Sequence, residues 1–187
     1  SMIEYLRSLG IKKGDRIAAY LPNVPETIVS MLASTALGAI FSSASPDFGS
    51  DGVLDRFGQI HPKILITADG YNYNGKEINI TQKVKEVVNG LPSLKGVVLI
   101  PLIQSEIFFQ NKNTYFYTDI LEKFSKSNLS FERLNLDDPL YIMYSSGTTG
   151  KPKCIVHSVG GVLLKHLVEL GLHSNAKNND KIFYFTT

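Results

Sequence analysis

Short runs of apolar residues alternate along this sequence with longer segments in which apolar residues recur every three or four positions. The short runs are typical of buried strands, and the recurring pattern is typical of helices with one buried face. Strands are predicted at residues 15–21, 39–44, 63–68, 96–102, 139–144, 154–158 and 182–186. Helices are predicted at residues 24–37, 51–60, 80–89 and 161–172, and a short element at 115–124 between polar loops.

The first predicted helix has recognisable start and stop signals. Asn23 is suited to cap it, Pro25 suits its first turn, and Gly38 ends it. Further along the chain, Asp69-Gly70 and Asn74-Gly75 mark turns.

Strands and helices alternate up to residue 102, which implies a mainly parallel sheet covered on both faces. The predicted fold class is therefore α/β, with mainly parallel sheets flanked by helices. We expect an α/β block at 1–102, an irregular connection at 103–138 and a final segment at 139–187.

The composition is that of an ordinary globular protein and excludes disorder and collagen-like repeats. Of 187 residues, 43% are hydrophobic, and 19 Lys and Arg face 17 Asp and Glu. A charge this close to neutral gives no basic surface for nucleic acid or an acidic membrane. The longest nearly apolar stretch, 28–41, is shorter than the ~18 residues that span a bilayer. We expect neither nucleic acid nor a membrane as a partner.

Cys154 is the single cysteine, so the chain can form neither an intramolecular disulfide nor a zinc site with several cysteines. This favours a reducing compartment, and we predict a cytoplasmic protein. The opening Ser1-Met2 is typical of residues left by expression in front of an internal start, so we expect a fragment.

The segment that carries chemistry is Ser-Ser-Gly-Thr-Thr-Gly-Lys-Pro-Lys at 145–153, directly after an apolar strand. Glycine permits positive φ, so that successive N–H groups can point into one concavity, and hydroxyls and lysines complete an anion site. A flexible polar turn is the alternative, which this composition makes less favourable. The predicted phosphate-binding residues are Ser145, Ser146, Gly147, Thr148, Thr149, Gly150, Lys151 and Lys153.

Two common phosphate-binding patterns do not fit this loop. The Walker pattern needs Gly where Ser145 stands and a hydroxyl residue where Pro152 stands. Gly147 and Gly150 cannot supply the three glycines of a dinucleotide-binding turn. P-loop kinases and dinucleotide oxidoreductases are therefore disfavoured.

Residues 144–153 instead resemble the phosphate-binding signature of adenylate-forming enzymes, which include acyl-CoA synthetases, luciferases and peptide-synthetase adenylation domains. Leu-Gly-Ile-Lys-Lys-Gly-Asp at 9–15 and Leu-Pro-Asn-Val-Pro-Glu at 21–26 are similar to short-chain acyl-CoA synthetases. The sequence also resembles the subgroup that activates acetoacetate, and this resemblance lies at residues 45–49, 52–60, 69–76 and 155–161. Phe41 replaces a frequent Trp, and Cys154 a usual Gly or Ala; we expect both to be buried and apolar.

The resemblance implies a ligase that converts acetoacetate and ATP into acetoacetyl-adenylate and pyrophosphate, and then transfers the acyl group to CoA. It implies ATP, Mg²⁺ and CoA as substrates or cofactors, nucleotide binding by the loop, and a place in lipid metabolism. The chain would be part of the large N-terminal domain, with 139–187 as its phosphate-loop segment.

The family's catalytic Lys would lie outside the chain, so the resemblance implies that the fragment is inactive and binds none of these molecules tightly. No catalytic residue or metal ligand is assigned within it. The alternatives are a synthetase for acetate or propionate and a non-catalytic nucleotide-binding module. The oligomeric state is not predicted.

Other candidate residues have simpler interpretations. His166 and His173 would lie ~10 Å apart along a helix, too far to share one metal ion. Asp137 and Asp138 are expected to be solvated, because neighbouring side chains on extended backbone point in opposite directions. For His157 we favour a strand-end role over a substrate contact.

Cys154 has no base beside it in the sequence and nothing that indicates a lowered pKa. It is therefore predicted to be a buried small residue rather than a nucleophile.

Overall fold

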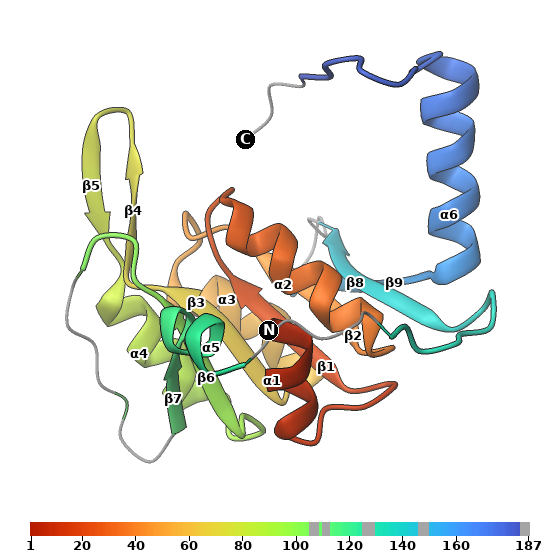
Figure 1. Ribbon diagram of the computed structural model, residues 1–187. Coiled ribbons are helices and arrows are strands. Elements are labelled where there is room, and N and C mark those ends of the chain that lie inside the picture. Colours follow the sequence, from red (N-terminus) through yellow and green to blue (C-terminus); the bar gives the residue numbers. More distant parts are fainter. Residues whose placement is uncertain (105–108, 110–112, 125–129, 146–149, 184–187) are drawn as a thin grey trace.

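A computed structural model describes residues 1–104, 109, 113–124, 130–145 and 150–183. Within these ranges the chain forms a seven-stranded sheet, a separate two-stranded hairpin and helices on both faces of the larger sheet (Figure 1). The first elements are α1 (Met2–Ser8), β1 (Arg16–Tyr20), α2 (Pro25–Ala36), β2 (Ile40–Ala44), α3 (Ser50–Ile60), β3 (Ile64–Ala68), β4 (Gly70–Tyr73) and β5 (Lys76–Asn79). The later elements are α4 (Thr81–Gly90), β6 (Gly96–Ile100), β7 (Asn113–Phe116), α5 (Tyr117–Lys123), β8 (Pro139–Ser145), β9 (Lys153–Ser158), α6 (Val159–Leu167) and the π-helix η1 (Val168–His173).

The strands of the larger sheet lie in the order β7-β6-β3-β1-β2-β8-β9. All neighbouring strands are parallel except β8 and β9, which pair antiparallel. The predicted α/β class with a mainly parallel sheet is confirmed, and β8 joins the same sheet as the first block through β2.

Two layers of core lie on opposite faces of this sheet. Along β1, Ala18 and Tyr20 face α3 and α4, whereas Ile17 and Ala19 face the side covered by α1, α2 and α5. All four side chains are fully buried, which is why this strand is a continuous apolar run rather than an alternating one.

The strands and helices predicted up to residue 102 are confirmed to within a few residues. The structure adds α1 and the strands β4 and β5, which the sequence pattern did not indicate, and beyond residue 102 β7 begins inside a segment that we expected to be a loop. The cap of α2 is Val24, in extended conformation and without a side-chain cap, so the prediction of Asn23 was wrong. Pro25 suits the first position of the helix, as predicted, because the N–H that it lacks has no partner within the helix.

The predicted turn at Asn74-Gly75 is confirmed as the connection of the β4–β5 hairpin. Asn74 and Gly75 have φ values of +49° and +72°. Positive φ at both central residues matches the right-handed twist of the paired strands and explains the Asn-Gly sequence.

The carboxyl-terminal elements differ from the prediction. The expected helix at 161–172 is present but changes into the π-helix η1 at Val168. Ile182 and Phe183, placed in a final strand by the sequence pattern, have no regular structure and are exposed. The rest of that predicted strand, 184–186, lies outside the described residues.

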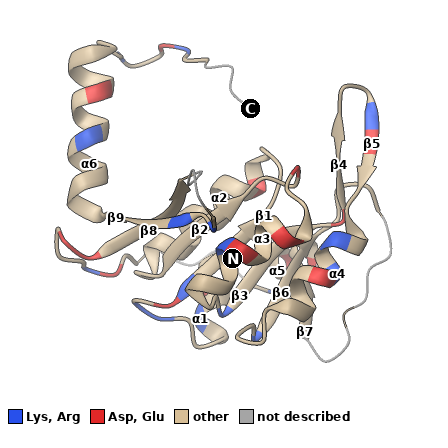
Figure 2. Ribbon diagram, turned by 180° about the vertical axis from the view of Figure 1, so that it is seen from behind, with Lys and Arg blue, Asp and Glu red and all other residues tan. Residues whose placement is uncertain are grey.

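Charged residues are interspersed along the ribbon in Figure 2, where α4 carries both acidic and basic residues, as does the helix formed by α6 and η1. In the described part of the chain, no helix has both the length and the apolarity needed to cross a membrane.

Candidate functional site

The predicted phosphate loop connects β8 to β9. Ser145 at the end of β8 pairs with Lys153 at the start of β9, and Tyr144 pairs with Cys154. Of the eight predicted binding residues, the structure describes four; Ser146, Gly147, Thr148 and Thr149 lie outside the described residues. The two strands thus fix where the loop leaves the sheet and where it returns.

Gly150 has the conformation that the sequence reasoning required of a glycine in this loop. Its φ is +127°, a region that side-chain-bearing residues rarely adopt. Among the described residues, apart from its chain neighbours, no heavy atom lies within 4 Å of the point where a Cβ would stand, so the described structure leaves the backbone open on that side. An anion can therefore approach the chain closely at this residue.

Two cations follow this glycine. Lys151 is 76% exposed, and its Nζ lies 3.5 Å from Oδ1 of Asp55 on α3. Lys153 is exposed and lies directly opposite Ser145, so these two side chains share one face of the β8–β9 hairpin. The structure therefore brings Ser145, Gly150 and Lys153 to one end of the hairpin.

The opposite face of the hairpin packs towards α3. The guanidinium carbon of Arg56 lies 5.8 Å from the Tyr144 ring centroid, and Sγ of Cys154 donates to Oε1 of Gln59 at 3.5 Å. Burial raises the pKa of Tyr144 to about 12, so its hydroxyl is neutral at physiological pH. Sequence reasoning missed these α3 residues, because their polar side chains resemble an ordinary solvated helix face.

A cavity of about 330 Å³ lies beside the start of the loop. Its lining includes Ser42 of β2 and Ser45, which directly follows β2, together with Arg56 and Tyr144. Ser42 Oγ donates to the carbonyl of Ile142 at 2.8 Å, which holds β8 against β2. The cavity thus lies where crevices bind ligands in open α/β sheets, near the carboxyl ends of parallel strands.

Asp138 fixes the start of β8. Its Oδ2 accepts from Nζ of Lys13 at 2.6 Å and from the backbone N–H of Asn135 at 2.6 Å. These bonds, the one from Lys13 first, hold the pKa of the carboxyl below its ordinary value. The prediction that Asp138 is merely solvated was therefore wrong, because Lys13 comes from a distant part of the chain.

Two residues near the loop have modest roles. Cys154 is half-buried rather than fully buried, and burial raises the pKa of its thiol, which disfavours the nucleophilic thiolate. His157 is half-buried in β9 and pairs with Tyr141 of β8.

On the neighbouring helix, Glu169 contacts Lys165 and lies 3.1 Å from Nδ1 of His173.

Comparison with known proteins assigns this loop and fold to a family. The family of AMP-binding enzymes matches residues 2–186. The chain belongs to this family. The resemblance to adenylate-forming enzymes, inferred from residues 144–153 and the flanking motifs, is thereby confirmed.

Individual AMP-binding enzymes extend the comparison. An acetoacetyl-CoA synthetase of Gallus gallus is 50% identical over 97% of this chain, and one of Rhizobium meliloti (strain 1021) is 48% identical over 97%. The structure of an acetoacetyl-CoA synthetase from Streptomyces lividans superimposes on 99% of the chain with a TM-score of 0.93 and 42% identity. The chain spans 28% of the length of each of these three proteins.

Proposed function

We propose that this chain is the phosphate-binding part of a longer ligase that joins acetoacetate to CoA and converts ATP into AMP and pyrophosphate. The relatives at 48–50% identity carry the name of that activity. Because the chain spans only 28% of their length, the remaining substrate contacts are expected in further polypeptide.

Two displacement steps make up the proposed reaction. A carboxylate oxygen of acetoacetate bonds to the α-phosphorus of ATP, and the bond from that phosphorus to the bridging oxygen of pyrophosphate breaks. The thiol sulfur of CoA then bonds to the carbonyl carbon of the adenylate, AMP leaves, and the thiol proton is released. The loop would act in the first step by holding the β- and γ-phosphates that depart.

The observation that carries this proposal is the backbone of Gly150, which has a positive φ and, in the described structure, is open on the side where a Cβ would stand. Gly150 follows the end of β8 and precedes two exposed lysines, Lys151 and Lys153. Backbone N–H groups and the cations Lys151 and Lys153 would stabilise the negative charge that accumulates on departing pyrophosphate. Fixed donors directed at developing charge lower a barrier because they need no reorganisation during the reaction.

The exposed apolar surface supports a role within a longer protein. Leu163, Leu164 and Leu167 of α6 and Leu172 of η1 are each at least half exposed. Further polypeptide packed on this side would remove them from water. We also propose a cytoplasmic location and a place in lipid metabolism, the location from the single Cys154.

We propose that the Mg²⁺ implied by the family resemblance binds together with ATP. Among the described residues, no group of three His, Cys, Asp or Glu side chains is placed to hold a metal ion.

Pyrophosphate exchange by the purified full-length protein tests the proposal. Exchange with ATP should depend on acetoacetate and exceed exchange with acetate or propionate at equal concentration. If acetate or propionate gave the faster exchange, the assignment of acetoacetate as the substrate would be wrong, but the class of reaction would stand. ATP binding without exchange for any of the three acids would favour a non-catalytic nucleotide-binding module.

A further inference from the structure

Helix α3 contacts the chain on both sides of the phosphate loop. Before the loop, its Arg56 lies over the ring of Tyr144 in β8. At the end of the loop, Nε2 of Gln59 donates to the carbonyl oxygen of Pro152 at 2.8 Å. One helix therefore contacts both the entry and the exit of the loop.

The amide of Gln59 is held in a single orientation by its other bonds. Nε2 also donates to the backbone carbonyl of Asp55 at 2.6 Å, one turn earlier on the same helix. Oε1 accepts from Sγ of Cys154 at 3.5 Å. The side chain thus contacts Pro152 and Cys154, the two neighbours of Lys153, although Gln59 itself is exposed.

The contacts of Gln59 and the alternation of side chains along β9 together determine the face on which the Lys153 side chain lies. Successive side chains along β9 point to opposite faces, so Cys154 faces α3 and Lys153 faces the other side, with Ser145. A bond on either side of Lys153 limits rotation of this short segment about its own axis.

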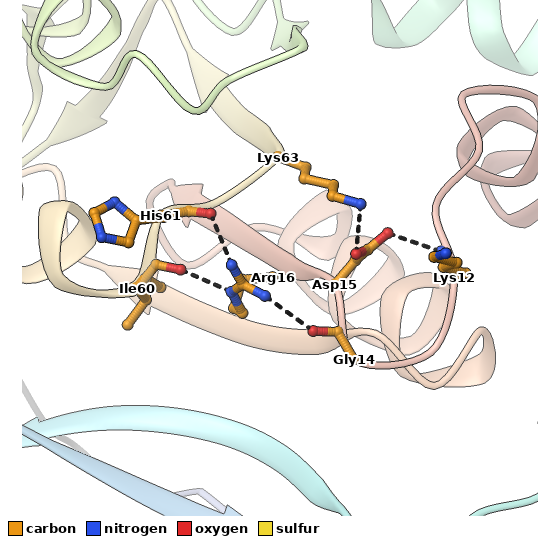
Figure 3. A network of polar contacts seen from close by, with 7 residues as sticks. All are labelled: Lys12, Gly14, Asp15, Arg16, Ile60, His61 and Lys63. Carbon is orange, nitrogen blue, oxygen red and sulfur yellow. Dashed lines mark hydrogen bonds and ion pairs between the residues drawn. The ribbon is translucent and has the colours of Figure 1, made fainter.

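The carboxyl end of α3 is itself firmly held. The Arg16 guanidinium donates to the carbonyl of Ile60 at 2.7 Å and to that of His61 at 3.3 Å (Figure 3). Phe57, two residues before Gln59, is fully buried in the core beneath the sheet. Gln59 therefore lies on a helix end that is anchored to the core and to Arg16.

We propose that Gln59 is a positioning residue that fixes the exit of the phosphate loop and directs Lys153 towards the triphosphate of ATP. This inference rests on the proposed function, because it assumes that the loop binds the phosphates of ATP. Asp55 adds a weaker contact from the same helix, through the Nζ of Lys151.

The experiment compares Gln59→Met with Gln82→Met in the full-length protein. Methionine matches glutamine in length and in helix propensity but lacks the amide donors. Gln82 is a suitable control because it is also an exposed helical glutamine, whose Nε2 donates to Glu86 on α4. Pyrophosphate exchange gives kcat and the KM values for ATP and acetoacetate, and thermal denaturation gives Tm.

Loss of the bond to Pro152 should raise the KM for ATP about three- to tenfold in Gln59→Met, the effect of one ordinary hydrogen bond. The KM for acetoacetate and the Tm should match those of Gln82→Met. Equal KM values for ATP in the two variants would overturn the proposal. Equal increases in both KM values together with a lowered Tm would also overturn it, because they would indicate a structural role.

Calorimetric titration with ATP separates this proposal from the function on which it rests. If the wild-type protein binds ATP but exchanges no pyrophosphate, the proposed ligase activity fails. Weaker ATP binding by Gln59→Met than by Gln82→Met would still support the positioning role, and equal binding would overturn it. A wild-type protein that binds no ATP would overturn both.

Discussion

Replacing Gly150 with valine tests the phosphate loop most directly. Its φ of +127° lies in a region that is nearly restricted to glycine, and a residue forced into such a region costs about 1–3 kcal/mol. In the part of the chain that the structure describes, no heavy atom beyond the neighbouring residues lies within 4 Å of the added Cβ, so the cost comes from the backbone and not from a clash. A β-branched residue should be near the upper end of this range.

The protein can avoid this strain if the backbone at residue 150, which is exposed, adopts an ordinary φ. The free energy of unfolding of Gly150→Val should therefore change little, while the conformation seen here loses population. A cost of 1–3 kcal/mol corresponds to a factor of about 5–150, which should appear as a higher KM for ATP. Obstruction of the phosphate by the side chain adds to this, so adenylation should be nearly abolished at ordinary ATP concentrations.

The assay is pyrophosphate exchange over a range of ATP concentrations in the full-length protein, with urea denaturation as the measure of stability. Gly10→Val is the matched control, since Gly10 has a φ of +72° and equally open surroundings but lies in the turn after α1. It should lose about 1–2 kcal/mol of stability and keep its KM for ATP. Exchange by Gly150→Val equal to the wild type would refute the assignment of the loop.

Four other outcomes are expected. Gly70→Ala should lower the free energy of unfolding by about 1–3 kcal/mol in urea denaturation, because its Cβ would lie 2.5 Å from the backbone oxygen of Ile78. Asp138→Asn should lower Tm at neutral pH by removing the ion pair with Lys13. Since the native pKa of this carboxyl is lowered, that stabilisation exists above its ordinary pKa and disappears as the pH falls through the native value, so the two Tm values should converge in acid. Lys153→Ala should raise the KM for ATP less than Gly150→Val does, because it removes one of several cations. The 187-residue chain alone should fold, show no pyrophosphate exchange above a boiled control, and bind ATP in calorimetry no more tightly than roughly millimolar, about −4 kcal/mol.

Most of the strands and helices up to residue 102, and the kind of loop, follow from local patterns in the sequence. Strands β1, β3 and β6 are continuous apolar runs, and such runs are recognisable because both faces of a parallel sheet are covered. The need for glycine at residue 150 could also be predicted, since it depends on the backbone of that residue alone. These features are local, so a short window of sequence contains their cause.

The side chains that support the loop are set by tertiary contacts between distant parts of the chain. Gln59 is separated by 93 residues from Pro152 and by 95 from Cys154, and Lys13 by 125 from Asp138. Their positions depend on β8 pairing with β2 and on α3 packing beneath the sheet. No local pattern distinguishes an exposed glutamine that holds a distant loop from one that faces only water, because the distinction lies in the partner that the fold brings to it.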